Sequence, residues 1–397
     1  MSKVPEGWEK CKVSDICNLQ NGNSFKPHEW DTQGLPIIRI QNLNGSSNFN
    51  YFSGKPLDKW LVETGQLLFS WAGTKGVSFG PFIWNGVKGV LNQHIYKVYN
   101  KDGINRDWLY LALAYVTNNI ESKAHGFKST LLHVQKKDID NQIVLVPNEI
   151  EQQKIAKILS TWDKAISATE QLISNSQQQK KMLMQGLLTG KKRVSSFKTN
   201  WKQRKISHLF TRVTTKNIEK NENVVTISGQ QGLIRQSEFF KKQVASEILD
   251  GYFLLQRGQF AYNKSYSNGY PMGAIKRLNK YEKGVVTTLY ICFEITNTEA
   301  CNSDFFEHYF ESGLLNKGLS QIAHEGGRAH GLLNVKPADF FSLSVFIPEI
   351  SEQQKIAQVL TAADREIELL QQKLAGLKQE KQALMQQLLT GKRRVVV

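Results

Sequence analysis

The chain has 397 residues and carries 51 Lys and Arg residues against 35 Asp and Glu residues, which gives a formal net charge of +16. Its hydrophobic fraction of 40% includes 20 Phe, 12 Tyr and 8 Trp, enough to fill folded cores, and this excludes a disordered chain. This length predicts two or three domains. The excess of positive charge favours a polyanionic partner, either nucleic acid or an anionic membrane surface.

Targeting segments and cysteine motifs are not found. The first residues lack the apolar core of a signal peptide, and no stretch approaches the roughly 18 apolar residues of a membrane span, so we expect a cytoplasmic protein. The four cysteines form no C-x-x-C pair, and we expect reduced thiols rather than disulfides or a zinc site.

Short apolar and aromatic segments, separated by Gly, Asn and Pro, predict strands in two globular regions. The predicted strands are 35–40, 66–71, 95–99, 224–227, 252–255 and 288–295. Helices are predicted over 108–116 and 304–315. Each globular region is therefore expected to be a mixed α/β (α+β) domain of about 150 residues.

An internal repeat organises the chain. Residues 151–159 (EQQKIAKIL) return at 352–360 as EQQKIAQVL, and 182–194 (MLMQGLLTGKKRV) return at 383–395 as ALMQQLLTGKRRV. A weaker echo, W-x-x-x-K-[VI]-S, begins at Trp8 and Trp201. A repeat of this kind predicts two copies of one domain-plus-helix unit. The predicted segments are a first recognition domain (1–147), a first helix (148–197), a second recognition domain (198–348) and a second helix (349–397).

Both helical segments carry an apolar seam with a spacing of 3.5 residues, which is typical of a coiled coil. Its apolar members are Ile155, Leu159, Trp162, Ile166, Ile173, Leu183, Leu187, Ile356, Leu360, Ile367, Leu370, Leu374, Leu377, Leu384 and Leu388, and the seam also includes Lys180 and Lys381. Asn148 and Ser351 are predicted helix N-caps, and Gly190 and Gly391 are predicted C-caps.

Chain connectivity favours an antiparallel pairing of these helices. A parallel pair would force the second globular region to stretch along a helix about 60 Å long. An antiparallel pair predicts a dumbbell with an approximate twofold axis. Two unrelated helices, each packed on its own domain, are the alternative.

Motifs for catalytic chemistry are missing or incomplete. The sequence has no P-loop and no Pro-Pro pair of an adenine methyltransferase loop, and His324 and His330 lack the spacing of a zinc-binding helix. We expect no metal site. One alternative stays open, a recognition module fused to a weak metal-dependent nuclease site made of Asp102, Glu121 and Lys123.

Basic and amide side chains recur on loops at equivalent places of the two globular regions. Lys and Arg neutralise phosphates, and Arg, Asn and Gln can bind base edges. The net charge is positive in all four segments, at +4, +4, +6 and +2, which favours a nucleic acid laid along the whole chain. The candidate DNA-binding residues are Arg39, Gln41, Asn42, Asn44, Trp71, Lys75, Lys128, Ser129, Gln230, Gln231, Arg235, Asn263, Lys264, Tyr266, Arg328 and His330.

Three motifs give the chain a family resemblance over its whole length. They are P-x(3)-E-Q-x-K-I, which includes Glu151 and Glu352, the paired L-L-T-G-K helix endings, and G-Q-L-L-F-S-W from Gly65 to Trp71. The second globular region departs from the last motif with G-Q-F-A-Y-N at Gly258. With these motifs the chain resembles the DNA-specificity subunit of type I restriction-modification systems.

The resemblance implies two target-recognition domains and conserved helices that form an antiparallel coiled coil. It also implies that this chain is not an enzyme and holds no cofactor. Two modification (adenine methyltransferase) subunits would dock on it and carry S-adenosylmethionine, and restriction subunits would add ATP- and Mg²⁺-dependent steps. Each domain is then expected to bind one half of a bipartite, asymmetric double-stranded DNA target, with the coiled coil setting the gap. A scaffold that binds DNA without sequence preference is a further alternative.

Overall fold

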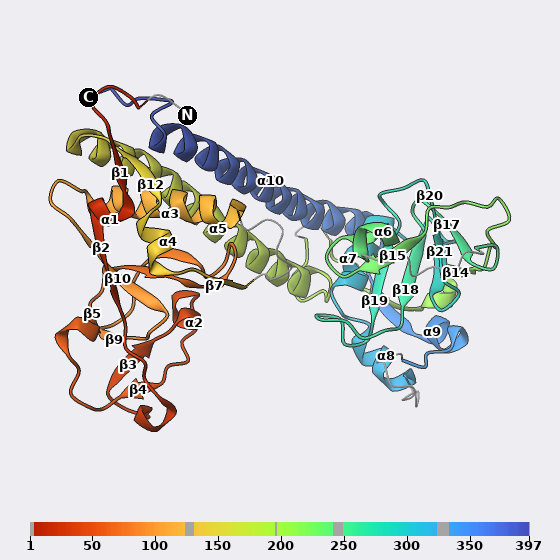
Figure 1. Cartoon of the computed structure of the whole chain (residues 1–397). Coiled ribbons are helices and arrows are strands. Elements are labelled where there is room, and N and C mark those ends of the chain that lie inside the picture. The colour runs from red at the N-terminus through yellow and green to blue at the C-terminus, as the bar shows by residue number, and fades with distance from the viewer. Residues whose placement is uncertain (1–3, 124–130, 195–196, 241–248, 324–332, 397) are drawn as a thin grey trace. The chain divides into compact units, whose positions relative to one another are not determined.

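The computed structural model describes residues 4–123, 131–194, 197–240, 249–323 and 333–396. The chain divides into two compact units, one made of Met1–Glu170 with Gln372–Val397 and the other of Gln171–Gln371. Each unit holds one globular domain and parts of two long helices, α5 (Glu149–Leu187) and α10 (Ile350–Leu389), which are labelled in Figure 1. Among the described residues, no helix is long and apolar enough to cross a membrane. The division into four segments stays a prediction.

The domain of the first unit contains two four-stranded sheets. One has the order β2-β10-β6-β8 and consists of β2 (Cys17–Asn21), β10 (Ile95–Asn100), β6 (Leu67–Ser70) and β8 (Gly80–Ile83), all antiparallel. The other has the order β4-β3-β9-β5 and consists of β4 (Tyr51–Phe52), β3 (Leu35–Ile38), β9 (Gly89–Leu91) and β5 (Leu61–Val62), with β3 parallel to β9. The described residues of the domain also form two strand pairs, four α-helices and two 3-10 helices: β1 (Glu9–Lys12) with β12 (Ile143–Val146), β7 (Ala72–Thr74) with β11 (Leu131–His133), α1 (Val13–Ile16), α2 (Ile40–Leu43), α3 (Arg106–Lys123), α4 (Lys136–Asp140), η1 (Pro27–Glu29) and η2 (Asp58–Trp60).

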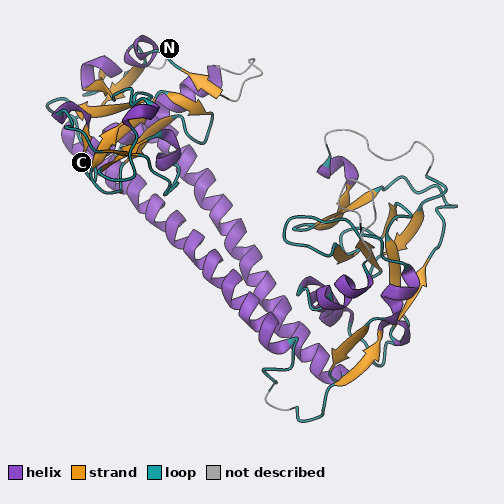
Figure 2. Ribbon diagram, turned by 90° about the horizontal axis from the view of Figure 1, so that it is seen from below, coloured by secondary structure: helices purple, strands orange, loops and turns teal. Residues whose placement is uncertain are grey.

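The domain of the second unit repeats the first sheet with the same connectivity. Its order β14-β21-β18-β19 consists of β14 (Phe210–Val213), β21 (Ile291–Ile295), β18 (Phe260–Asn263) and β19 (Ala274–Arg277). Around it lie β13 (Lys202–Lys205) with β22 (Ser344–Ile347), the hairpin β15 (Val225–Ser228) and β16 (Gly232–Arg235), β17 (Phe253–Gln256) with β20 (Lys283–Val286), α6 (Gln236–Phe239), α7 (Ser303–Glu311), α8 (Asn316–Ile322) and α9 (Pro337–Ser342). Strands and short helices thus mix in both domains, which confirms the predicted fold class (Figure 2).

Each predicted strand coincides with an observed strand to within a few residues. The helix predicted over 108–116 is longer in the structure, where α3 spans Arg106–Lys123. The helix predicted over 304–315 is shorter, because α7 ends at Glu311 and Gly313 adopts a φ of 73° before α8 begins. A left-handed residue at that position breaks the helix in two.

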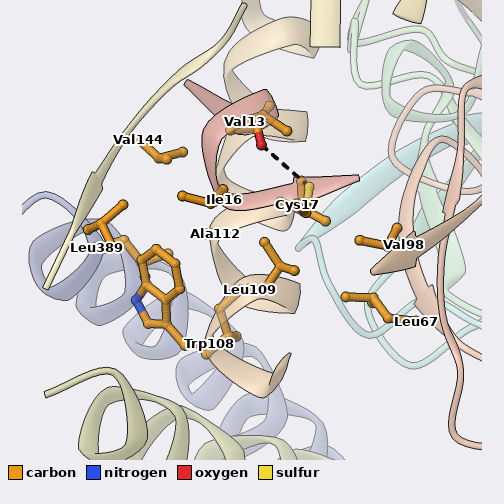
Figure 3. Close-up of a cluster of buried hydrophobic side chains, with 14 of the residues drawn as sticks. Val13, Ile16, Cys17, Leu67, Val98, Trp108, Leu109, Ala112, Val144 and Leu389 are labelled. Carbon is orange, nitrogen blue, oxygen red and sulfur yellow. Dashed lines mark hydrogen bonds between the residues drawn. The ribbon is translucent and has the colours of Figure 1, made fainter. Parts of the chain in front are cut away.

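The core of the first unit is completed by the two long helices. Trp108 and Leu109 of α3 pack with Val13 of α1, and Leu389 from the end of α10 lies beside Trp108 (Figure 3). Ile155, from the start of α5, belongs to the same buried cluster and is 1% exposed. The Cys17 thiol lies in this core, where it donates to the carbonyl oxygen of Val13 at 3.5 Å, and burial raises its pKa to about 12.

The core of the second unit uses the opposite ends of the same two helices. Leu187 and Leu188, at the end of α5, cluster with Ile356 and Leu360, near the start of α10. They pack in one cluster with an aromatic group around Phe210. Each core therefore requires residues from the start of one long helix and the end of the other.

Within each unit α5 and α10 run antiparallel. In the first unit Asp163 pairs with Lys381 at 2.5 Å and Glu170 with Lys378 at 2.7 Å. In the second unit Ser176 donates to Glu366 at 3.2 Å. Residue numbers rise along α5 as they fall along α10, which confirms the predicted direction of pairing. All fifteen predicted apolar seam residues are buried or half-buried.

The two seam lysines are each paired with an aspartate of the facing helix. Lys180 forms an ion pair with Asp364, as Lys381 does with Asp163, and both the lysines and the aspartates lie one repeat apart. The lysine side chains are only 18% and 20% exposed. A lysine in an apolar seam is costly without a partner, so these pairs favour one register over others.

A buried glutamate anchors each pair of helix ends. Glu151, at the start of α5, accepts two hydrogen bonds from Arg394, at 2.8 and 2.9 Å, and one from the Trp8 indole at 3.0 Å. The Arg394 guanidinium also lies 5.6 Å from the centre of the Trp8 ring. The carboxylate is 0% exposed, so these donors offset the cost of burying its negative charge.

The second unit repeats this arrangement. Glu352 accepts from Arg193 at 2.7 and 2.8 Å and from the Trp201 indole at 3.2 Å. The next residue also repeats, because Gln152 and Gln353 each donate to the proline carbonyl that precedes their helix, at 2.9 and 3.0 Å. The E-Q pair of the repeated motif is thus a structural clamp at the start of each helix.

Three of the four predicted helix caps agree with the structure. The Asn148 side chain accepts from the Glu151 backbone at 3.0 Å, and Gly190 and Gly391 adopt φ values of 71° and 66° just beyond their helices. The prediction for Ser351 was wrong, because α10 begins at Ile350 and Ser351 lies inside its first turn. Its side chain instead donates to Glu349, the counterpart of Asn148 in the repeat.

Replacing Glu352 with Ala leaves the buried indole of Trp201 without its acceptor and removes the carboxylate partner of Arg193, which keeps the Thr199 carbonyl. We expect the free energy of unfolding to fall by about 3 kcal/mol, because a buried N–H loses its acceptor and a hydrogen-bonded ion pair is lost. Urea unfolding of the full chain measures this change. Glu282→Ala removes an exposed pair with Arg257 and serves as the control, with an expected change below about 0.5 kcal/mol. Equal effects of the two substitutions would contradict the anchoring role of Glu352.

Candidate nucleic-acid interface

Two of the three predicted pairs of loop sites fall on comparable elements of the two domains. The first pair follows β3 in one domain and occupies the β15–β16 hairpin in the other. The second pair follows β6 and β18, which hold the same place in the repeated sheet. The third pair, Lys128 and Ser129 with Arg328 and His330, lies outside the described residues.

Arg39 lies against an aromatic ring with its donors unused. Its guanidinium carbon is 5.3 Å from the centre of the Trp30 ring, and Trp30 is 39% exposed. Its buried Nε has no hydrogen-bond partner among the described residues. A cation–π contact with Trp30 therefore supports the guanidinium, and its terminal N–H groups form no hydrogen bond with a described residue, an arrangement suited to a guanine edge or a phosphate.

Asn42 has a different role from the one predicted. The residue is 6% exposed, its amide donates to the backbone of Ser46 and Asn48 at 3.0 Å each, and its oxygen accepts from the Arg39 backbone at 3.0 Å. This side chain shapes the loop and has no free edge to present to a base. Gln41 and Asn44 are exposed, although the Gln41 amide also donates to the Asn48 carbonyl at 3.1 Å.

Trp71 belongs to an aromatic and histidine cluster. Its ring centre lies 5.1 Å from that of His94, 4.6 Å from His133 and 5.9 Å from Tyr96, and its indole donates to the Gln93 carbonyl at 3.0 Å. Burial, with a further contribution from His133, lowers the pKa of His94. The neutral ring that results is compatible with close packing against Trp71.

Lys75 lies in a turn that is fastened to the end of α3. Its ammonium donates to the Glu121 carbonyl at 2.8 Å, and the Glu121 carboxylate accepts from the Gly76 backbone at 2.7 Å. Glu121 is 8% exposed and serves as an anchor for this turn.

In the second domain Gln230 and Gln231 are exposed at the tip of the β15–β16 hairpin. Arg235, at the end of β16, lies 5.3 Å from the centre of the Tyr281 ring, and its Nε donates to Asn223 at 3.1 Å. Arg235 thus resembles Arg39 in resting on an aromatic ring, although one of its donors is used within the domain.

The residues after β18 match those after β6. Trp71 and Lys264 are each the first residue after the equivalent strand, and their carbonyls accept from Val134 at 3.0 Å and from Leu333 at 2.9 Å, respectively. The Lys264 ammonium is directed inward to the Val335 carbonyl at 3.3 Å, and burial lowers its pKa.

The other two candidates, Asn263 at the end of β18 and Tyr266 after it, differ in exposure. The Asn263 oxygen accepts from the Ser265 backbone at 3.1 Å, so this side chain shapes the turn. Tyr266 is 64% exposed and is the side chain of this group best placed to meet a partner.

The nuclease alternative fails on geometry. Asp102 precedes α3, whereas Glu121 and Lys123 lie at its far end, and the helix separates them by about 22 Å. Glu121 is already engaged by the Gly76 backbone. Within the described parts of the chain, no three His, Cys, Asp or Glu side chains are grouped to hold a metal ion.

Comparison with known proteins identifies the family. The model of the type I restriction modification DNA specificity domain matches residues 5–176 and again 198–379. The chain belongs to this family. Its two matches correspond to the two copies of the sequence repeat.

Relatives over the full length agree with this assignment. The chain is 24% identical to the type I restriction enzyme MjaVIII specificity subunit of Methanocaldococcus jannaschii, an alignment that covers 99% of this chain and 94% of the relative. It is 25% identical to the putative MjaX specificity subunit of the same organism, with 100% and 96% covered.

Solved structures share the fold. The S subunit of a type I restriction-modification system from M. genitalium superposes with a TM-score of 0.56 at 16% identity and covers 98% of this chain and 97% of its own. A chain described in work on complex assembly and conformational transition of the type I system gives a TM-score of 0.58 at 12% identity, with 98% and 99% covered.

Arg39 offers the sharpest test of the first recognition domain. We expect Arg39→Ala to weaken binding to the specific duplex by about 1–3 kcal/mol, and Arg39→Lys to restore charge-driven binding but not the preference at the base pair concerned. Binding titrations against specific and unrelated duplexes separate the two effects.

Arg106→Ala is the matched control, because Arg106 is exposed and paired with Asp107. An Arg39→Ala variant that binds as Arg106→Ala does would exclude Arg39 from the interface.

Proposed function

We propose that the chain is the sequence-reading subunit of a type I restriction-modification complex and that each globular domain binds one half of a bipartite, asymmetric DNA target. One observation carries this proposal: the two domains share a sheet of identical connectivity, while the loops around it differ in length, sequence and contacts. A shared framework with unlike loops suits two binding modules that read unlike sequences.

Electrostatics and loop chemistry support the same function. A net charge of +16 supplies phosphate affinity that does not depend on sequence. Arg39 and Arg235, each held on an aromatic ring, and the exposed amides Gln41, Asn44, Gln230 and Gln231 are the candidates for base contacts.

The long helices are proposed to set the gap between the half-sites and to bind partners. Two aliphatic side chains on their outer faces, Ile158 (37% exposed) and Val359 (42% exposed), lie one repeat apart. Equivalent surfaces on the two helices suit two copies of one modification subunit.

In this proposal the chain itself is non-catalytic and works in the cytoplasm. S-adenosylmethionine, ATP and Mg²⁺ belong to the modification and restriction subunits.

Exchange of a whole domain tests whether each domain reads its own half of the DNA target. Residues 1–147 are replaced by the corresponding domain of another family member, and methylated sites are mapped in cells that also express the modification subunit. We expect one half of the methylated sequence to change and the other half to stay the same. A change in both halves of the methylated sequence, or in neither, would contradict the proposal that each domain reads one half-site. A scaffold without sequence preference would give salt-dependent methylation or binding with no shared sequence.

Matched insertions test the spacing role of the helices. One heptad is inserted after Glu170 in α5 and one after Gln371 in α10, where the two compact units divide. The ion pairs on both sides keep their partners, and each helix grows by about 10.5 Å, equivalent to about 3 base pairs of B-DNA. We expect the gap in the methylated sequence to lengthen by about 3 base pairs. Insertion in α5 alone is the control and is expected to disrupt pairing with α10. An unchanged gap after the double insertion would contradict the proposal that the helices set the gap between the half-sites.

A further inference from the structure

The hairpin tip that carries Gln230 and Gln231 is braced by a group of partly buried polar contacts. The Tyr270 hydroxyl lies 2.7 Å from the Gly229 carbonyl oxygen at the start of this tip. It also lies 2.5 Å from a carboxylate oxygen of Glu311, the last residue of α7. The hydroxyl has one proton, so it donates to one of these two oxygens at a time, and this one side chain lies between the hairpin tip and α7.

Lys276, on β19, completes this group. Its ammonium donates to the Tyr270 hydroxyl at 3.0 Å and to Glu311 at 2.5 Å, and it lies 4.9 Å from the centre of the Tyr270 ring. The Lys276 side chain is 12% exposed and the Glu311 side chain 33%, so the lysine end of this ion pair is largely buried and the carboxylate end is partly open to solvent. Burial and the neighbouring carboxylate raise the pKa of Tyr270, which keeps its hydroxyl protonated and able to donate.

The local backbone is adapted to this contact. A Cβ at Gly229 would lie 2.6 Å from a carbon of the Tyr270 ring, so only glycine lets the ring approach this closely. The Gln231 backbone donates to the buried Ser228 hydroxyl at 3.2 Å, and Gly232 has a φ of 76°. The tip is thus held by the Ser228 hydroxyl, which belongs to the hairpin itself, and by Tyr270, which comes from another segment.

The two glutamine side chains have no such restraint. Both are exposed, and neither forms a side-chain hydrogen bond with a described residue. A cavity of about 410 Å³ beside them is lined by four basic and four acidic side chains, so it has no excess charge to attract a phosphate. The hairpin tip is therefore the part of this region that is free to meet a base edge.

We propose that Tyr270, supported by Glu311 and Lys276, is a positioning residue that holds the Gln230–Gln231 tip in its reading geometry and so sets how strictly the second half-site is discriminated. The inference rests on the proposed function, since it assumes that this tip contacts DNA. Hydrogen bonds to base edges depend on placement within a few tenths of an ångström, whereas phosphate attraction tolerates larger shifts. Loss of the brace is therefore expected to reduce specificity more than affinity.

The test uses the full chain in complex with its modification subunit. Methylation rates are compared for the specific duplex and for duplexes that carry one base-pair change in either half-site. Tyr270→Phe removes only the hydroxyl. We expect changed second half-sites to be methylated about tenfold more readily, relative to the specific duplex, than by the natural chain. Discrimination in the first half-site, and the salt dependence of binding, stay as they were.

Two further variants make the result specific. Tyr262→Phe is the matched control, because the Tyr262 hydroxyl donates to the Met272 carbonyl at 2.7 Å in the same domain and not to the Gly229 carbonyl of the tip. It is expected to discriminate as the natural chain does. Gly229→Ala displaces the Tyr270 ring without removing a polar group and is expected to relax the second half-site as Tyr270→Phe does, which keeps the test valid if one variant folds poorly.

Unchanged discrimination in Tyr270→Phe and Gly229→Ala would overturn the positioning role, as would equal relaxation of both half-sites. Failure of the proposed function has a different signature, because the natural chain itself would then show no half-site discrimination.

Discussion

Both cores depend on residues that are remote in sequence and come from opposite ends of the two long helices. In the first unit Ile155 and Leu388 share one buried cluster, and in the second unit Leu187 and Ile356 do. The Glu151–Arg394 contact joins residues 243 positions apart and closes the chain on itself. Neither domain can complete its core without both helices, so folding of the domains and pairing of the helices are coupled.

The seam lysines show how one register is favoured. Lys180 pairs with Asp364, and Lys381 has the equivalent pair one repeat away. A slip of one heptad in either direction would set Lys180 against Ala357 or Gln371, so this lysine would lose its carboxylate. Leucine at the lysine positions would bury more apolar surface but would penalise a slipped pairing less. Charge in the seam therefore exchanges some stability for a defined helix alignment, and a defined alignment is what a fixed gap between half-sites requires.

The repeat made the long helices predictable, because a seam spacing of 3.5 residues over ten positions has few alternative interpretations. The individual strands were also predictable from short apolar runs between turn residues. The Ser351 cap was not, since a serine with glutamine three residues later matches the capping pattern, yet Glu349 occupies the capping position. Local patterns do not decide between adjacent starts of one helix.

The binding loops were predictable in place but not in detail. Residue type suggested Asn42 as a base reader, whereas tertiary contacts use its amide to shape the loop. The rings beneath Arg39 and Arg235 come from Trp30 and Tyr281, on other segments, and no spacing in the sequence connects them. The brace of Tyr270 on Gly229 spans 41 residues and was missed for the same reason. A basic residue near a group of amides marks such loops, but the rings that support the arginines can be found only from the fold.

The central claim is that one chain with two unlike domains on paired helices reads a two-part sequence with a fixed gap. The most direct measurement maps the methylated bases across the genome of cells that express the natural chain with its modification subunit. The account predicts methylation at a single asymmetric sequence in two parts, separated by a constant number of unspecified base pairs. Methylation at an uninterrupted sequence, at two parts with a variable gap, or at sites with no sequence in common would contradict it.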